Sequence, residues 1–121
     1  MNPVDRIREI LDIYHKYGWK LERVLMRTET REAVVQEQIS FADARIEEGT
    51  MDALWFSRAS HNNRDAWELR LVAESNYALF ETFETDESEE DREEVRCEMA
   101  ARMREYVNRE PGGSKELSDE Y

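Results

Sequence analysis

The fold is decided by residues 51–84, which read MDALWFSRASHNNRDAWELRLVAESNYALFETFE. This stretch contains three apolar and aromatic runs, at 53–57, 66–73 and 77–83, with short polar connections between them. Runs of this length between turn-forming residues predict β-strands. Because strands that follow one another through short loops usually pair with each other, the stretch predicts an antiparallel three-stranded meander.

Two sets of residues alternate along the central predicted strand. The apolar set is Trp67, Leu69, Leu71 and Ala73, and the more polar set is Glu68, Arg70, Val72 and Glu74. Alternate residues of a strand point to opposite faces of a sheet, so one face is expected to pack in the core and the other to meet solvent. We expect helices to cover the apolar set.

The opposite face of the predicted sheet is a candidate interaction surface. We expect it to expose Trp55 and Val72 among the charged side chains of Glu68 and Arg70, an aromatic anchor with a polar rim. Ion pairing between neighbouring strands, with one incidental aromatic side chain, accounts for the same residues equally well. A strand boundary displaced by one residue would exchange the two faces.

Residues 2–17 predict a helix. Asn2 can cap its free amide groups, Pro3 suits its first position, and Gly18 ends it. The apolar side chains fall within about half of the helical circumference, namely Val4, Ile7, Ile10, Leu11, Ile13, Tyr14 and Tyr17. This amphipathic helix is expected to pack on another element.

Three further elements complete the predicted order. Residues 19–27 favour a strand, and the apolar spacing after Thr30 predicts a helix over 31–44. Residues 39–48 remain open between helix, loop and short strand, because Gly49 indicates a break. An acidic run leads into a last helix over 88–110, with Ser88 as its N-cap.

These elements predict one α+β domain. The order α-β-α-β-β-β-α favours a two-layer sandwich, in which helices cover one face of a four-stranded, mainly antiparallel sheet. The predicted domain spans residues 1–110, and residues 111–121 are expected to form a flexible tail because they contain little apolar content.

Charge limits the classes of partner. The 121 residues include 29 acidic and 17 basic side chains, for a net charge of −12. Such a field repels phosphate backbones and anionic lipid, so direct binding to nucleic acid or membrane is not expected. Residues 81–121 hold 15 of the acidic and 6 of the basic side chains, which predicts attraction of a basic protein partner.

No catalytic, cofactor-binding or metal-binding residue is predicted, because the sequence lacks a phosphate loop, a histidine cluster and an activated nucleophile. His61 and Arg64, in a polar turn, are weak ligand candidates, although a turn explains them more simply. The single cysteine, Cys97, cannot form an internal disulfide. With no signal peptide or membrane-spanning run expected, this favours a cytoplasmic protein.

The sequence therefore predicts a non-enzymatic protein-interaction domain. It is expected to act as a homodimer, through the second sheet face or an edge strand, or to bind a basic protein. Chaperones and immunity proteins offer analogies of composition and architecture only. The alternative is a small ligand-binding domain or enzyme with a pocket between sheet and helices.

Overall fold

The computed structural model describes residues 2–109 of the chain. Clustering of the fold divides the chain into two compact units, Met1–Glu87 and a second unit that begins at Ser88. The predicted tail, 111–121, lies outside the described residues. The single domain predicted over residues 1–110 stays a prediction.

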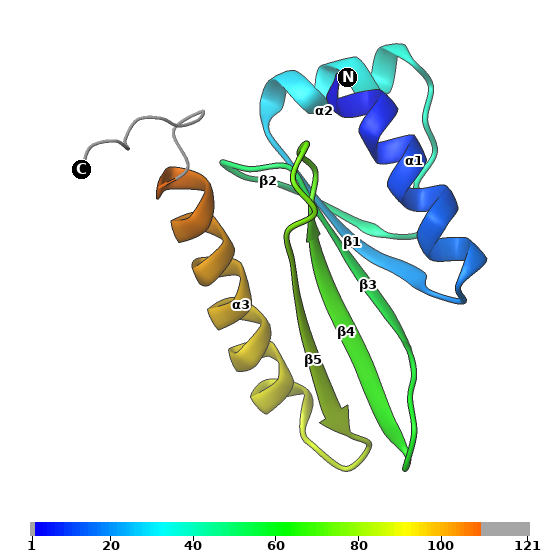
Figure 1. Ribbon diagram of the computed structural model, residues 1–121, viewed down its shortest axis with the longest axis vertical. Helices are drawn as coiled ribbons and strands as arrows, with labels where there is room; N and C mark the ends of the chain where they lie inside the picture. Colours follow the sequence, from blue (N-terminus) through cyan, green and yellow to red (C-terminus); the bar gives the residue numbers. More distant parts are fainter. Residues whose placement is uncertain (1, 110–121) are drawn as a thin grey trace. The chain divides into compact units, whose positions relative to one another are not determined.

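The first unit contains two helices and one mixed five-stranded sheet (Figure 1). Its elements are α1 (Pro3–Lys16), β1 (Lys20–Met26), α2 (Thr28–Gln36), β2 (Arg45–Glu48), β3 (Ala53–Ala59), β4 (Arg64–Leu71) and β5 (Ala78–Glu84). The strand order across the sheet is β2-β1-β3-β4-β5. The α+β class is confirmed, whereas the four-stranded sheet is corrected to five strands.

The additional strand is β2, which pairs parallel to β1 through Val24 and Ile46. The predicted helix over 31–44 is wrong in its second half, because α2 ends at Gln36 and the chain then takes positive φ angles at Gln38 and Ala42. The apolar residues after Thr30, with Ile46 as the last of them, have the spacing typical of a helix. Residues 45–48 instead form a short strand, because they pair with the edge of β1. A short strand is one of the possibilities left open for 39–48.

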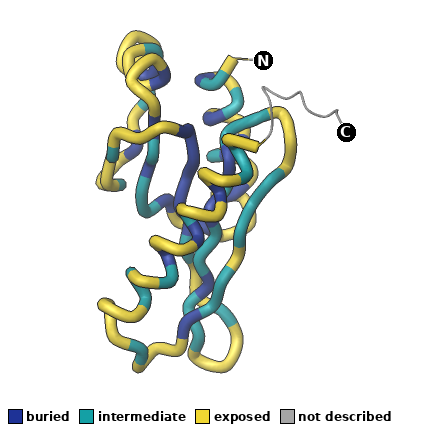
Figure 2. Tube along the Cα trace, turned by 90° about the vertical axis from the view of Figure 1, so that its left-hand side faces the viewer, coloured by how far each residue is buried: buried dark blue, intermediate teal, exposed yellow. Residues whose placement is uncertain are grey.

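Helix α1 forms as the sequence predicts. The side chain of Asn2 accepts a hydrogen bond from the backbone N–H of Asp5, at 2.9 Å, and Pro3 occupies the first turn. Gly18 has a φ of 85°, a left-handed conformation that favours glycine, and the helix ends before it. Buried and exposed residues alternate along α1 with helical periodicity (Figure 2).

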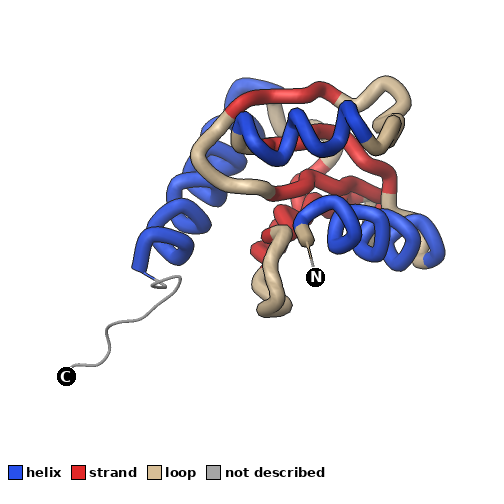
Figure 3. Tube along the Cα trace, turned by 90° about the horizontal axis from the view of Figure 1, so that it is seen from above, coloured by secondary structure: helices blue, strands red, loops and turns tan. Residues whose placement is uncertain are grey.

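The register of the sheet determines which residues share a face with α1. Phe56 pairs with Glu68, and Glu68 pairs with Phe80. Directly paired residues project to the same side, and the ring of Tyr14 in α1 stacks on Phe56 with centroids 4.1 Å apart. Seen from above, α1 lies along the sheet (Figure 3). The face under α1 is therefore that of Phe56, Glu68 and Phe80.

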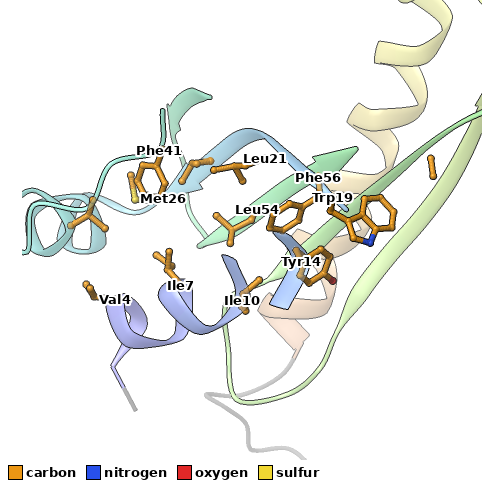
Figure 4. Packing of buried hydrophobic residues seen from close by; sticks show 13 residues of the cluster. Val4, Ile7, Ile10, Tyr14, Trp19, Leu21, Met26, Phe41, Leu54 and Phe56 are labelled. Carbon is orange, nitrogen blue, oxygen red and sulfur yellow. The ribbon is translucent and has the colours of Figure 1, made fainter. Parts of the chain in front are cut away.

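The core of the first unit lies between this face and the helices (Figure 4). Ile7 and Ile10 of α1 are buried against Leu54 and Phe56 of β3, within one apolar cluster that also contains Val34 of α2. Burial of aliphatic and aromatic side chains contributes roughly 1.5–3 kcal/mol each. This cluster fixes α1 on the sheet.

The second unit contains α3, Glu89–Arg109. Its predicted N-cap is confirmed, since the hydroxyl oxygen of Ser88 accepts a hydrogen bond from the backbone N–H of Asp91 at 3.1 Å. Arg96 forms ion pairs with Glu89 and Glu93 of the same helix. In residues 2–109, no helix combines the length and apolar character needed to cross a membrane.

Candidate functional site

A groove opens where the C-terminal end of α1 meets strands β1, β3 and β4. We call it the Trp19 groove. Its volume is about 340 Å³, and it is lined by Ile13, Tyr14, Tyr17, Trp19, Arg58, Glu68 and Arg70. All of these residues belong to the first unit.

Arg58 and Trp19 form one wall of this groove. The guanidinium carbon of Arg58 lies 4.4 Å from the centroid of the Trp19 ring, a geometry that attracts a cation to the electron-rich face of the indole. Nη1 of Arg58 also donates a 2.6 Å hydrogen bond to the backbone carbonyl of Tyr17. The arginine is thus held in place between strand β3 and the end of α1.

Tyr14 and Glu68 meet in the same groove. The hydroxyl of Tyr14 donates a hydrogen bond to the carboxylate of Glu68. The pKa of Tyr14 is raised to about 12, first by burial and then by the hydrogen bond to Glu68 and the negative charge of Glu68, while Arg70 acts in the opposite direction. At neutral pH the tyrosine therefore keeps its proton and acts as a donor.

Arg70 is fixed at the other side of the Trp19 groove. Its Nη2 donates to the side-chain oxygen of Asn76 at 3.0 Å, and its Nε donates to the carbonyl of Leu71 at 3.3 Å. The same oxygen of Asn76 accepts from Arg6 of α1 at 3.1 Å. This network positions a second guanidinium group at the groove.

Exposed apolar side chains gather around Trp19. Ile13 is 49% exposed and Tyr17 is 63% exposed, and both line the groove. Phe80 of β5 is 57% exposed and meets the Trp19 ring edge to face, with centroids 6.4 Å apart. Among residues 2–109, the other large apolar side chains with comparable exposure are Val35 and Ile46. The groove thus brings together three of these five.

The predicted interface residues do not share one face. Trp55 pairs with Leu69, whereas Glu68 pairs with Phe56, so Trp55 projects to the side opposite Glu68 and Arg70. Trp55 is only 2% exposed, and its ring meets Trp67 with centroids 6.0 Å apart. The predicted exposure of Trp55 is wrong. Helix α1 packs on the face of Phe56 and Glu68 and not on that of Trp67, because alternation groups residues without telling which group faces a given helix.

The structure brings Glu68 and Arg70 together in the Trp19 groove, and separates the other candidates from it. Val72 is partly buried and packs on the core cluster under α1. His61 is exposed in the β3–β4 turn, where its carbonyl accepts from the backbone N–H of Arg64 at 3.2 Å. The ligand role of His61 stays a prediction.

Arg64 is engaged with the neighbouring strand. Its Nε donates to the hydroxyl of Thr82 at 2.9 Å, and its Nη1 contacts Glu84 at 3.2 Å. These bonds tie the β3–β4 turn to β5. They explain the arginine as part of the sheet, and its ligand role also stays a prediction.

Sequence reasoning missed Trp19, Arg58, Ile13 and Tyr17 as members of a site. The apolar arc predicted for the first helix does contain Ile13 and Tyr17, but only packing on another element is predicted for it. One signal was present, because an arc that covers half of a helix is wider than the stripe a two-layer packing needs. The apolar side chains beyond that stripe, Ile13 and Tyr17, are exposed at the end of α1.

A second polar cluster lies at the start of α2, and its carboxylate, that of Asp52, is hydrogen-bonded to other residues of the chain. Asp52, 6% exposed, accepts hydrogen bonds from the backbone N–H of Arg27 at 2.9 Å and from the hydroxyl of Thr30 at 2.7 Å. The Arg27 guanidinium donates to the same carboxylate at 3.1 Å, and this bond raises the pKa of Arg27 above its ordinary value. This carboxylate caps the helix.

Within the described part of the chain, no three His, Cys, Asp or Glu side chains are placed to hold a metal ion together.

Comparison with protein-family models, with curated proteins and with solved structures found no match. The Trp19 groove combines aromatic side chains, guanidinium donors and exposed aliphatic carbon.

Proposed function

We propose that the chain is a protein-interaction domain that holds an extended segment of a partner protein in the Trp19 groove. The observation that carries the proposal is the gathering of Ile13, Tyr17 and Phe80 around Trp19. Exposed apolar side chains scattered singly are ordinary on a soluble protein, whereas a group of them beside polar residues is typical of a binding surface.

The composition of the groove supports a protein partner. Trp, Tyr and Arg are the residue types that contribute most to protein–protein binding energy, and this groove contains Trp19, Tyr14, Tyr17, Arg58 and Arg70. The side chains of Trp19, Tyr14, Arg58 and Arg70 are pre-positioned by the ring and hydrogen-bond contacts described above. A partner therefore loses less free energy in ordering this surface than it would on a mobile one.

The openness of the groove distinguishes a peptide from a small ligand. A small-molecule site buries most of its ligand, whereas Tyr17 at the rim of this groove is 63% exposed. An extended peptide suits such a surface because it needs only some of its side chains buried. The homodimer and the basic partner expected from the sequence remain predictions about other surfaces of the chain.

Selection from a random peptide display library tests the proposal. The double variant Tyr17→Ser/Phe80→Ser removes exposed apolar surface from the groove, and Val35→Ser/Ile46→Ser removes it elsewhere as a matched control. We expect the wild-type chain and the control to enrich peptides with a shared motif, and the groove variant to bind these peptides at least tenfold more weakly. Equal binding by all three proteins, or no enrichment on the wild type, would overturn the proposal.

A further inference from the structure

We infer that the segment bound in the Trp19 groove carries a carboxylate next to an apolar side chain, so that the partner is recognised through an acidic peptide. This inference rests on the proposed function and specifies its ligand. Its basis is the local charge of the groove, which differs in sign from the net charge of −12 carried by the chain.

The charges lining the groove leave a positive excess. Arg58 and Arg70 contribute two guanidinium groups, and Glu68 contributes one carboxylate. The carboxylate of Glu68 already accepts a hydrogen bond from Tyr14, whose raised pKa keeps that donor protonated. An incoming carboxylate therefore meets two cations and only one anion.

The geometry of Arg58 leaves donors available to a ligand. One nitrogen, Nη1, is used on the carbonyl of Tyr17, and the guanidinium carbon lies over the Trp19 ring, 4.4 Å from its centroid. Guanidinium groups bind carboxylates through parallel N–H donors that lie in the guanidinium plane. Within residues 2–109, Nε and Nη2 of Arg58 make no other hydrogen bond, so these two donors can reach a carboxylate.

Apolar recognition is placed beside these donors. Ile13 and Tyr17 line the groove that contains Arg58 and Arg70, and Phe80 lies against Trp19. In an extended peptide, adjacent side chains point to opposite sides and those two apart point to the same side. A carboxylate can therefore reach the arginines while an apolar side chain two residues along the peptide covers Phe80 or Ile13.

The net charge of the chain opposes acidic ligands at long range, but the local contacts decide the outcome. At physiological ionic strength the screening length is about 8 Å, so acidic side chains farther away than this contribute little. Charge-assisted hydrogen bonds act at contact distance and are about twice as strong as neutral ones. Selectivity for a carboxylate is therefore expected to survive at physiological salt.

Three blocked peptides that differ at one position test the inference. Acetyl-Gly-Leu-Phe-X-Gly-amide, with X as Asp, Asn or Lys, is titrated into the full chain, and the dissociation constant is measured from the indole N–H resonance of Trp19. We expect the Asp peptide to bind about tenfold more tightly than the Asn peptide, which corresponds to about 1.4 kcal/mol, and the Lys peptide to bind most weakly.

Arginine variants assign this preference to the groove. Arg58→Gln/Arg70→Gln is expected to reduce the ratio of Asp to Asn affinity to about one. Arg31→Gln, on the exposed side of α2, serves as the control and is expected to keep the tenfold ratio. An unchanged amide spectrum outside the groove shows that each variant remains folded.

Each contrary result has a defined meaning. Equal affinity for the Asp and Asn peptides, with binding lost in Tyr17→Ser/Phe80→Ser, overturns the acidic ligand and leaves the interaction groove intact. Inorganic phosphate that shifts the Trp19 resonance as strongly as the Asp peptide, at equal concentration, also overturns it, because a free anion then suffices. Binding of none of the three peptides overturns it too, and the display selection then decides the proposed function separately.

Discussion

Two carboxylates of the first unit, Asp52 and Glu68, are both hydrogen-bonded to residues of the helical layer, but they differ in how completely the chain satisfies them. Both oxygens of Asp52 accept hydrogen bonds, from the backbone and guanidinium of Arg27 and from the hydroxyl of Thr30. Glu68 accepts one hydroxyl, that of Tyr14, and lines an open groove.

The difference separates a structural polar cluster from a binding one. The donors around Asp52 include a backbone N–H and a buried hydroxyl, both of which lose their acceptor if the carboxylate is removed. Around Glu68, the side chains of Tyr17 and Arg58 are exposed in the groove and keep capacity for a ligand. Changes at Asp52 should therefore affect stability, whereas changes around Glu68 should affect binding more than stability.

The largest effect is expected for Asp52→Ala. The substitution leaves the amide of Arg27 and the hydroxyl of Thr30 without an acceptor, and we expect the free energy of unfolding to fall by about 3 kcal/mol. Equilibrium unfolding in urea measures the change. Asp12→Ala, on the exposed side of α1, is the control and should change stability by less than about 0.5 kcal/mol. Equal effects of the two substitutions would contradict the structural role of Asp52.

Alkaline pH should lower the stability of the fold, because Tyr14, which donates a hydrogen bond to Glu68, loses its proton. The pKa of Tyr14 is raised from 10.0 to about 12 in the folded chain, so its contribution to stability is complete below pH 10. As the pH rises from 10 towards 12, the unfolded chain loses this proton first, and unfolding becomes more favourable. Urea unfolding at several pH values should show a steeper loss for the wild type than for Tyr14→Phe. Parallel curves would show that the environment does not perturb Tyr14.

At neutral pH the hydroxyl of Tyr14 should contribute less than the Asp52 cluster does. Tyr14→Phe keeps the ring stacked on Phe56 and removes only the hydrogen bond to the partly buried Glu68. We expect a loss of about 1 kcal/mol in the free energy of unfolding. Tyr17→Phe, which removes the hydroxyl of a 63% exposed tyrosine, is the matched control and should be neutral. A neutral Tyr14→Phe would indicate that water replaces the donor.

Local patterns predicted the elements but not their faces. Capping and periodicity placed α1 and β1 almost to the residue, because Asn2 and Gly18 mark the helix ends directly. The strand β2 was not predicted as such, because four residues at a sheet edge have little signal of their own and depend on pairing with β1. The face covered by α1 depends on Tyr14 stacking on Phe56, a contact 42 residues apart in sequence.

The candidate site could be predicted only in part for the same reason. Glu68 and Arg70 were predicted because alternation along one strand places them on the sheet face opposite Trp67 and Leu69. Trp19 and Arg58 become neighbours only when β1 pairs with β3 in the observed register. No spacing within the sequence encodes that pairing, so long-range packing had to be known before the groove could be recognised.

The smallest change in stability is expected for Phe80→Ser. This substitution separates an effect on binding from an effect on stability. Phe80 and Phe83 lie on the same strand, but Phe80 is 57% exposed and Phe83 is 1% exposed. We expect Phe80→Ser to change the free energy of unfolding by less than about 0.5 kcal/mol and Phe83→Ser to lower it by about 3 kcal/mol or more. The Phe80 variant should nevertheless lose most of its affinity for the Asp peptide, measured by the Trp19 indole resonance. A stability loss at Phe80 comparable to that at Phe83 would mean that its ring supports the fold, and the distinction between the two carboxylate regions would then fail.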